Sequence, residues 1–103
     1  MAVSTVDVRT EIDTGQGWEF EVVLTRPGFG MSVHTVHLSW QDYDLWSRGA
    51  HPPVRVIEAL LTYLLDHDGE AALRDKFDAA RVRRFLPDVD KAMRAAIQPD
   101  EPD

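Results

Sequence analysis

The sequence contains no cysteine among its 103 residues. This absence excludes disulfide bonds, thiolate nucleophiles, thiolate-bound zinc and iron–sulfur clusters, so a hydrophobic core must stabilise the fold. Long apolar runs are also missing, because the most apolar stretch, residues 54–65, contains Arg55 and Glu58. The N-terminus reaches a charge at Asp7 without the apolar segment of a signal peptide. We therefore expect a cytoplasmic protein that does not associate with membranes.

Positive charge is scarce and unevenly distributed. The chain has 11 Lys and Arg against 18 Asp and Glu, which gives a net charge of −7 and disfavours nucleic-acid binding by the surface as a whole. Most of the basic residues nevertheless fall within residues 74–94: Arg74, Lys76, Arg81, Arg83, Arg84, Lys91 and Arg94. Because guanidinium groups make forked contacts with phosphate and carboxylate, this segment is a candidate for binding an anionic partner.

The N-terminal half has the period-two alternation of β-strands. Apolar residues alternate with polar ones over residues 6–12 and 18–24, and again over residues 33–40. Glycine-containing segments at residues 13–17 and 26–30 separate these runs and favour turns. The pattern predicts an antiparallel meander of three strands, with His34, Val36, Leu38 and Trp40 on one face of the third strand.

The C-terminal half has helical spacing. Ser39 is a candidate N-cap that accepts from the amide of Asp42, and opens a short helix that Gly49 ends. The apolar positions of residues 54–65 predict a central helix, and shorter helices are expected over residues 70–77, 79–86 and 87–97. We therefore predict an α+β fold in one domain over residues 1–97, with three to four C-terminal helices and an acidic disordered tail over residues 98–103.

No pattern in the sequence indicates catalysis or a cofactor. His34 and His37 are three apart on a predicted strand and therefore point to opposite faces, whereas His51 and His67 flank the central helix. The acidic run at residues 66–70 is too short for a calcium loop. Nucleophile elbows and phosphate-binding glycine loops are also missing, so we predict no catalytic residue, metal ligand or cofactor.

Two groups of residues are candidates for an interaction surface. Trp46 and Phe29 are the aromatic residues that we expect to be exposed at an interface, because tryptophan is enriched in binding hot spots. Arg81, Arg83 and Arg84 are the second group. In the alternative interpretation, the tryptophans are core residues and the arginines pair with neighbouring aspartates. The sheet also leaves edges to which another chain can add a strand.

Residues 34–94 resemble a group of small bacterial proteins of unknown function. The similarity rests on the strand His34–Leu38, the leucine-rich helix around residues 59–65, and two turn segments at residues 76–78 and 84–88. These are packing and turn residues, so the resemblance implies no activity.

Three functional hypotheses remain. The leading one is a small non-enzymatic protein-interaction module, which either forms a homodimer or binds an unknown protein partner. The alternative is a regulatory nucleic-acid-binding protein that uses the basic segment 74–94, where two short helices hint at a helix-turn-helix. The least favoured is a small hydrolase or metal-dependent enzyme.

Overall fold

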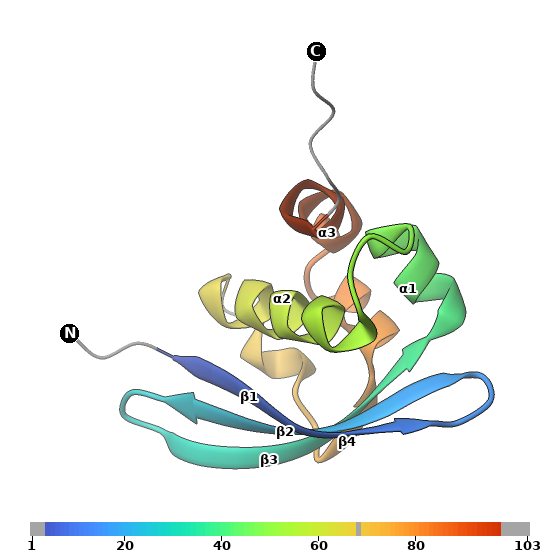
Figure 1. Cartoon of the computed structure of the whole chain (residues 1–103). Helices are drawn as coiled ribbons and strands as arrows, with labels where there is room; N and C mark the ends of the chain where they lie inside the picture. The colour runs from blue at the N-terminus through green and yellow to red at the C-terminus, as the bar shows by residue number, and fades with distance from the viewer. Residues whose placement is uncertain (1–3, 68, 98–103) are drawn as a thin grey trace.

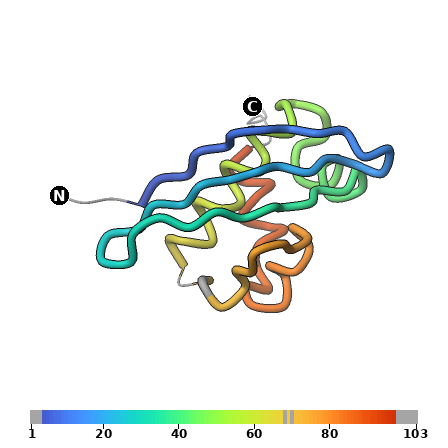
Figure 2. The backbone as a smooth tube through the Cα atoms, turned by 90° about the horizontal axis from the view of Figure 1, so that it is seen from below, coloured from blue at the N-terminus to red at the C-terminus, as the bar shows by residue number. Residues whose placement is uncertain are grey.

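The computed structural model describes residues 4–67 and 69–97, and it combines one sheet with helices on one of its faces (Figure 1). Helices α1 to α3 and both 3₁₀ helices lie on the same side of the sheet, whose other face is open in the view from below (Figure 2). The elements in chain order are β1 (Thr5–Asp13), β2 (Gly17–Arg26), β3 (Gly30–Ser39), α1 (Trp40–Ser47), α2 (Pro53–Asp66), the 3₁₀ helix η1 (Glu70–Ala72), β4 (Lys76–Asp78), the 3₁₀ helix η2 (Ala79–Arg84) and α3 (Val89–Ile97).

The three-stranded antiparallel meander predicted from the sequence is confirmed, but the sheet has a fourth strand. Its strand order is β1-β2-β3-β4, and β4 pairs in parallel with residues 35–37 of β3. A parallel pair requires a crossover, which α1 and α2 supply between β3 and β4. The meander therefore forms from neighbouring segments, whereas the fourth strand returns from the distant C-terminal half.

The alternation of the strands divides the sheet into a buried face and an open face. Phe20, Val22, Leu24, Val36 and Leu38 are fully buried and face the helices. In β1 the register shifts between Val8 and Thr10. This bulge changes the phase of the strand, so that Ile12 lies opposite Glu19 on the open face.

Helix α1 begins at Trp40, so the third strand ends one residue earlier than expected, at Ser39, and it begins three residues earlier, at Gly30. The predicted N-cap is confirmed, because the hydroxyl of Ser39 accepts a hydrogen bond from the amide of Asp42 over 3.1 Å. At the other end, Arg48 has a φ of 51° and Gly49 follows with a φ of 76°. These two residues, both in the left-handed conformation, end the helix at the position that Gly49 predicts.

Helix α2 forms the centre of the helical layer. Pro52 and Pro53 stand at its start, where a missing amide costs no hydrogen bond. Five apolar side chains of this helix are fully buried against the sheet and the C-terminal segments: Val56, Ile57, Leu60, Leu61 and Leu64. The central apolar helix predicted over residues 54–65 is thus confirmed.

The predictions for residues 70–88 were wrong in detail. The helix expected over residues 70–77 is the short 3₁₀ helix η1 followed by β4, because Phe77 enters the core through pairing with β3. The helix expected over residues 79–86 is the 3₁₀ helix η2, and Phe85, expected to be buried, is 38% exposed. The last helix begins at Val89 and buries Val89, Met93 and Ile97, which are the apolar residues predicted for it.

One cluster of buried residues joins the sheet to all three α-helices and to η2. Within the described part of the chain, no helix has both the length and the apolar character that crossing a membrane requires. The acidic tail predicted over residues 98–103 lies outside the described residues.

Candidate functional site

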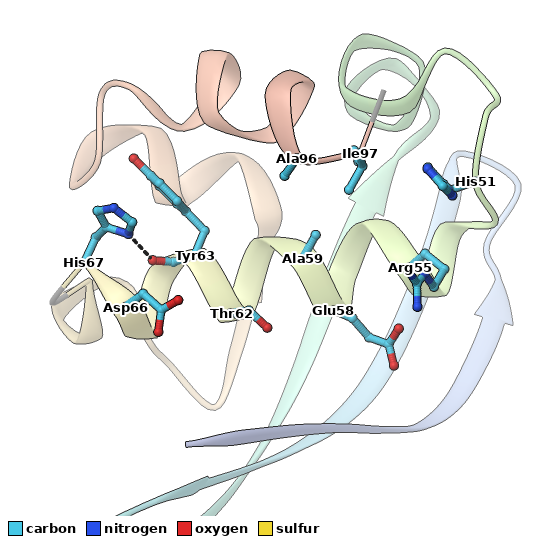
Figure 3. Close-up of a pocket in the computed structure, with 10 residues that line it drawn as sticks. All are labelled: His51, Arg55, Glu58, Ala59, Thr62, Tyr63, Asp66, His67, Ala96 and Ile97. Atoms are coloured by element: carbon cyan, nitrogen blue, oxygen red, sulfur yellow. Dashed lines mark hydrogen bonds between the residues drawn. The ribbon is translucent and has the colours of Figure 1, made fainter. Parts of the chain in front are cut away.

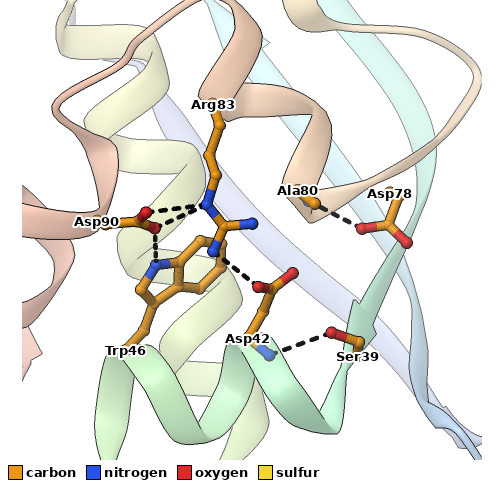
Figure 4. A network of polar contacts seen from close by, with 7 residues as sticks. All are labelled: Ser39, Asp42, Trp46, Asp78, Ala80, Arg83 and Asp90. Carbon is orange, nitrogen blue, oxygen red and sulfur yellow. Dashed lines mark hydrogen bonds and ion pairs between the residues drawn. The ribbon is translucent and has the colours of Figure 1, made fainter.

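Trp46, expected at an exposed interface, is fully buried, so that expectation was wrong. Its indole Nε1 donates a hydrogen bond to Oδ1 of Asp90 over 2.6 Å (Figure 4). The guanidinium of Arg83 lies 5.1 Å from the Trp46 ring. A buried indole requires a polar partner for its N–H, and α3 supplies that partner through Asp90.

Arg83 belongs to the same internal network (Figure 4). Its Nε donates to both carboxylate oxygens of Asp90, at 2.9 and 3.0 Å, and its Nη2 donates to Oδ1 of Asp42 over 2.7 Å. Burial acts to lower the pKa of the Arg83 guanidinium, but the hydrogen bonds and charges of Asp42 and Asp90 outweigh it and raise the pKa above its usual value. Arg83 thus connects η2 to α1 and α3, and two carboxylates neutralise its charge in a partly buried network.

Arg81 and Arg84 have a different environment, in a surface pocket beside β4 and η2. Nε of Arg81 donates to the carbonyl of Ala72 over 3.1 Å, and its guanidinium lies 5.1 Å from the ring of Phe85. Arg84 is exposed and has neither an ion pair nor a hydrogen bond with any residue in the described ranges. The three arginines that the sequence grouped together therefore separate into one residue paired with two carboxylates and two pocket residues.

Phe29 is exposed, as expected, with 77% of its surface accessible. It lies in the turn between β2 and β3, where the guanidinium of Arg26 stacks 4.9 Å from its ring. The Nε atom of Arg26 is buried and has no hydrogen-bond partner within the described chain. Two further apolar side chains follow on the open face of β3: Met31, 68% exposed, and Val33, 56% exposed.

The first half of β3 is a free edge of the sheet. The amide of Thr35 donates to the carbonyl of Asp75, on the side away from β2. The register between β2 and β3 is continuous, and backbone direction alternates along a strand. The N–H and C=O groups of Met31 and Val33 therefore also point away from β2, while β4 pairs only with residues 35–37. We call residues 31–33 the free β3 edge.

The opposite edge, β1, carries features that prevent strand addition. The bulge near Arg9 interrupts its ladder, and Nε of Arg9 forms an ion pair with Asp7 over 2.6 Å. Four charged residues lie along the strand: Asp7, Arg9, Glu11 and Asp13. Bulges and charges of this kind protect edge strands from pairing with other chains. The free β3 edge has no charged residue and no bulge, so the two edges differ in kind.

A second pocket, of about 460 Å³, lies between α2 and the end of α3 (Figure 3). Its polar residues on α2 mix charges of both signs: Arg55 and Glu58 near the start of the helix, and Asp66 near its end. The ring Nδ1 of His67 lies 2.9 Å from the carbonyl of Tyr63, which directs that nitrogen back to the helix. Within residues 4–67 and 69–97, no three histidine or carboxylate side chains are grouped so that they could hold a metal ion.

Comparison with protein-family models, with curated proteins and with solved structures finds no match. The resemblance to small bacterial proteins therefore stays a prediction, and the functional interpretation depends on the geometry of the chain itself.

Sequence reasoning missed the free β3 edge. The predicted strand began at Val33 and the preceding turn segment ended at Gly30, so Met31 was assigned to neither. The alternation of exposed apolar residues at positions 29, 31 and 33 was the available signal. This alternation indicates a free edge only in combination with the fourth strand, which covers residues 35–37 and leaves the preceding residues unpaired.

Proposed function

We propose that this chain is a small protein-interaction module that forms a homodimer through the free β3 edge. The observation that carries this proposal is the set of four outward-pointing backbone groups on Met31 and Val33, beside two exposed apolar side chains. An unprotected edge next to apolar surface is a place where another strand adds.

A second copy satisfies these groups by symmetry. When two β3 strands run antiparallel about a two-fold axis at Ser32, Met31 lies opposite the partner's Val33, and Val33 lies opposite the partner's Met31. Both pairs are hydrogen-bonded pairs, so four backbone hydrogen bonds form at once. The side chains of these pairs also meet on the open face, where Val23 of β2 already lies beside Val33.

The charges at the two ends of the free β3 edge are complementary. Arg26 stands at one end, opposite Gly30, and has an unpaired Nε. Asp75 stands at the other end, and its side chain makes no ion pair or hydrogen bond with the described residues. An antiparallel two-fold arrangement brings the Arg26 end of each copy toward the Asp75 end of the other.

The nucleic-acid alternative has less support in the geometry. Arg83 is neutralised internally, and Lys91 and Arg94 lie on α3 and do not line the pocket that contains Arg81 and Arg84. The basic segment thus does not form a continuous positive surface, which binding along a phosphate backbone requires.

Sedimentation velocity over a concentration series tests the homodimer. Because the paired edge is short, we expect a transient dimer with a dissociation constant in the micromolar range. Replacing Met31 and Val33 together by lysine places like charges opposite each other across the axis, and should weaken dimerisation more than tenfold. The two added charges reduce the net negative charge of each copy, so general repulsion between copies cannot cause this weakening.

The matched control is the double substitution Thr5→Lys and Thr10→Lys, which adds the same charge to exposed positions of β1. It should leave the dissociation constant within about twofold of that of the unmodified chain. Val33→Pro removes one outward N–H without removing a bond to β2, and should also weaken the dimer. A chain that stays monomeric at millimolar concentration, or a lysine variant that dimerises normally, would contradict the proposal.

A further inference from the structure

The pocket beside β4 and η2 concentrates positive charge. Its volume is about 350 Å³. The residues that line it come from the segment before β4, from β4 itself and from η2: Arg74, Lys76, Phe77, Asp78, Ala80, Arg81 and Arg84. Four of these seven are cations, and Asp78 is the one carboxylate in this set.

Two of the pocket arginines are held by carbonyls and not by carboxylates. Nη1 of Arg74 donates to the carbonyls of Ala71 and Leu73, at 3.2 and 2.8 Å, and Nε of Arg81 donates to that of Ala72 over 3.1 Å. A carbonyl fixes the position of a guanidinium without cancelling its charge. Each group keeps further N–H donors for a ligand, since a guanidinium carries five.

The carboxylate of Asp78 is engaged on both of its oxygens. Oδ1 accepts from the amide of Ala80 over 2.8 Å, where it caps η2, and Oδ2 lies 3.0 Å from Nδ1 of His37. Lys76 has a single ion pair, with Glu19 at 3.7 Å, and its side chain is largely exposed. Exposed pairs of this kind contribute little energy and exchange readily. Asp78 and Glu19 therefore leave most of the positive charge of the pocket uncompensated.

In the same segment, the positive charge of Arg83 is compensated by carboxylates. Two carboxylates, Asp42 and Asp90, hold its guanidinium over 2.7 to 3.0 Å. Its neighbour Arg84, one residue further along, is exposed at the pocket and has no such partner. The fold thus separates a structural arginine from arginines that remain available.

We propose that this pocket binds the phosphate group of a phosphate monoester. Three arginines line one concave site, and a doubly charged, compact oxyanion matches the fork geometry of guanidinium groups and the excess charge of the pocket better than a single carboxylate does. The pocket is small, about 350 Å³, and the rest of the chain is acidic, which favours one phosphate group over a nucleic-acid backbone. The site is independent of the dimer proposed above.

Titration of ¹⁵N-labelled protein with inorganic phosphate, followed by NMR, tests the site. We expect saturable shifts of the Ala80, Arg81 and Arg84 amides with a dissociation constant in the millimolar range, and no such shifts with sodium chloride at equal ionic strength. Arg84→Gln should raise the dissociation constant about fivefold to tenfold, because it removes a charge-assisted contact. Arg94→Gln is the matched control on α3, and should change it less than twofold.

Four further probes identify the molecule that carries the phosphate group and exclude competing ligands. Phosphoserine carries the phosphate group on an amino-acid side chain, and glycerol phosphate carries it on a small metabolite. If either compound binds more tightly than inorganic phosphate, the result supports the proposal and identifies the source of the phosphate group. Succinate that binds as tightly as phosphate overturns the assignment to phosphate. The site itself is overturned if Arg84→Gln and Arg94→Gln weaken the binding of an oligonucleotide equally. It is also overturned if phosphate binding is not saturable.

Discussion

The indole of Trp46 and the carboxylate of Asp90 are joined by a 2.6 Å hydrogen bond across 44 residues of sequence. Asp90 accepts simultaneously from Arg83, which also reaches Asp42. One carboxylate on α3 thus organises a tryptophan from α1 and an arginine from η2. This polar bridge fixes the three short elements that lie beside α2, where apolar contacts alone do not specify orientation.

Arg83→Met should destabilise the protein by about 2–4 kcal/mol, because it leaves the nearly buried carboxylate of Asp42 without its cation. Arg84→Met, at the next position, is the matched control and should change the free energy of unfolding by less than about 0.5 kcal/mol, since Arg84 is exposed. Urea denaturation followed by circular dichroism measures both. Equal effects of the two substitutions would show that Arg83 has no structural role.

Trp46→Phe should destabilise the protein by about 1–3 kcal/mol, because it removes the hydrogen bond to Asp90 and leaves a partly empty site in the core. The comparison is Trp40→Phe, at a position 54% exposed, where we expect less than about 1 kcal/mol. Thermal unfolding monitored by circular dichroism distinguishes them. A larger effect at position 40 would contradict the placement of Trp46.

Gly17→Ala should destabilise the protein by about 2–4 kcal/mol, since a Cβ at this position overlaps the carbonyl oxygen of Leu38 on the neighbouring strand. Gly15, in the same turn, has a φ of 82° and open space around it. Gly15→Ala therefore bears only the cost of the left-handed conformation, about 1 kcal/mol. Chemical denaturation of the two variants should preserve this order, and the reverse order would exclude the close approach of β2 and β3 at Gly17.

Local patterns were sufficient to predict the meander, the Ser39 cap and helix α2. In each case the signal lies within a few neighbouring residues: the alternation from Trp18 to Leu24, the hydroxyl three residues before Asp42, and the apolar spacing after Pro53. Burial of one face then follows from the pattern itself.

Strand β4 and the Trp46 network could not be predicted in the same way. A three-residue strand has too few positions to show a period, and Phe77 is placed by pairing with Val36, far away in the sequence. The sequence shows the charges of Arg83, Asp42 and Asp90, and pairing of the arginines at positions 81, 83 and 84 with neighbouring aspartates was one interpretation. The contact with Asp42, 41 residues away, depends on how α1 packs and not on spacing.

The return of β4 to the sheet has a consequence for the protein during its synthesis. His37 and its β4 neighbour Asp78 are 41 residues apart, so translation of the meander finishes well before its fourth strand exists. During this interval the outer edge of β3 is unpaired along its whole length, including the segment that Lys76–Asp78 later covers. Exposed strand edges make nascent chains prone to aggregation. The β3 edge of the meander is therefore open to pairing with other chains until β4 folds back onto it.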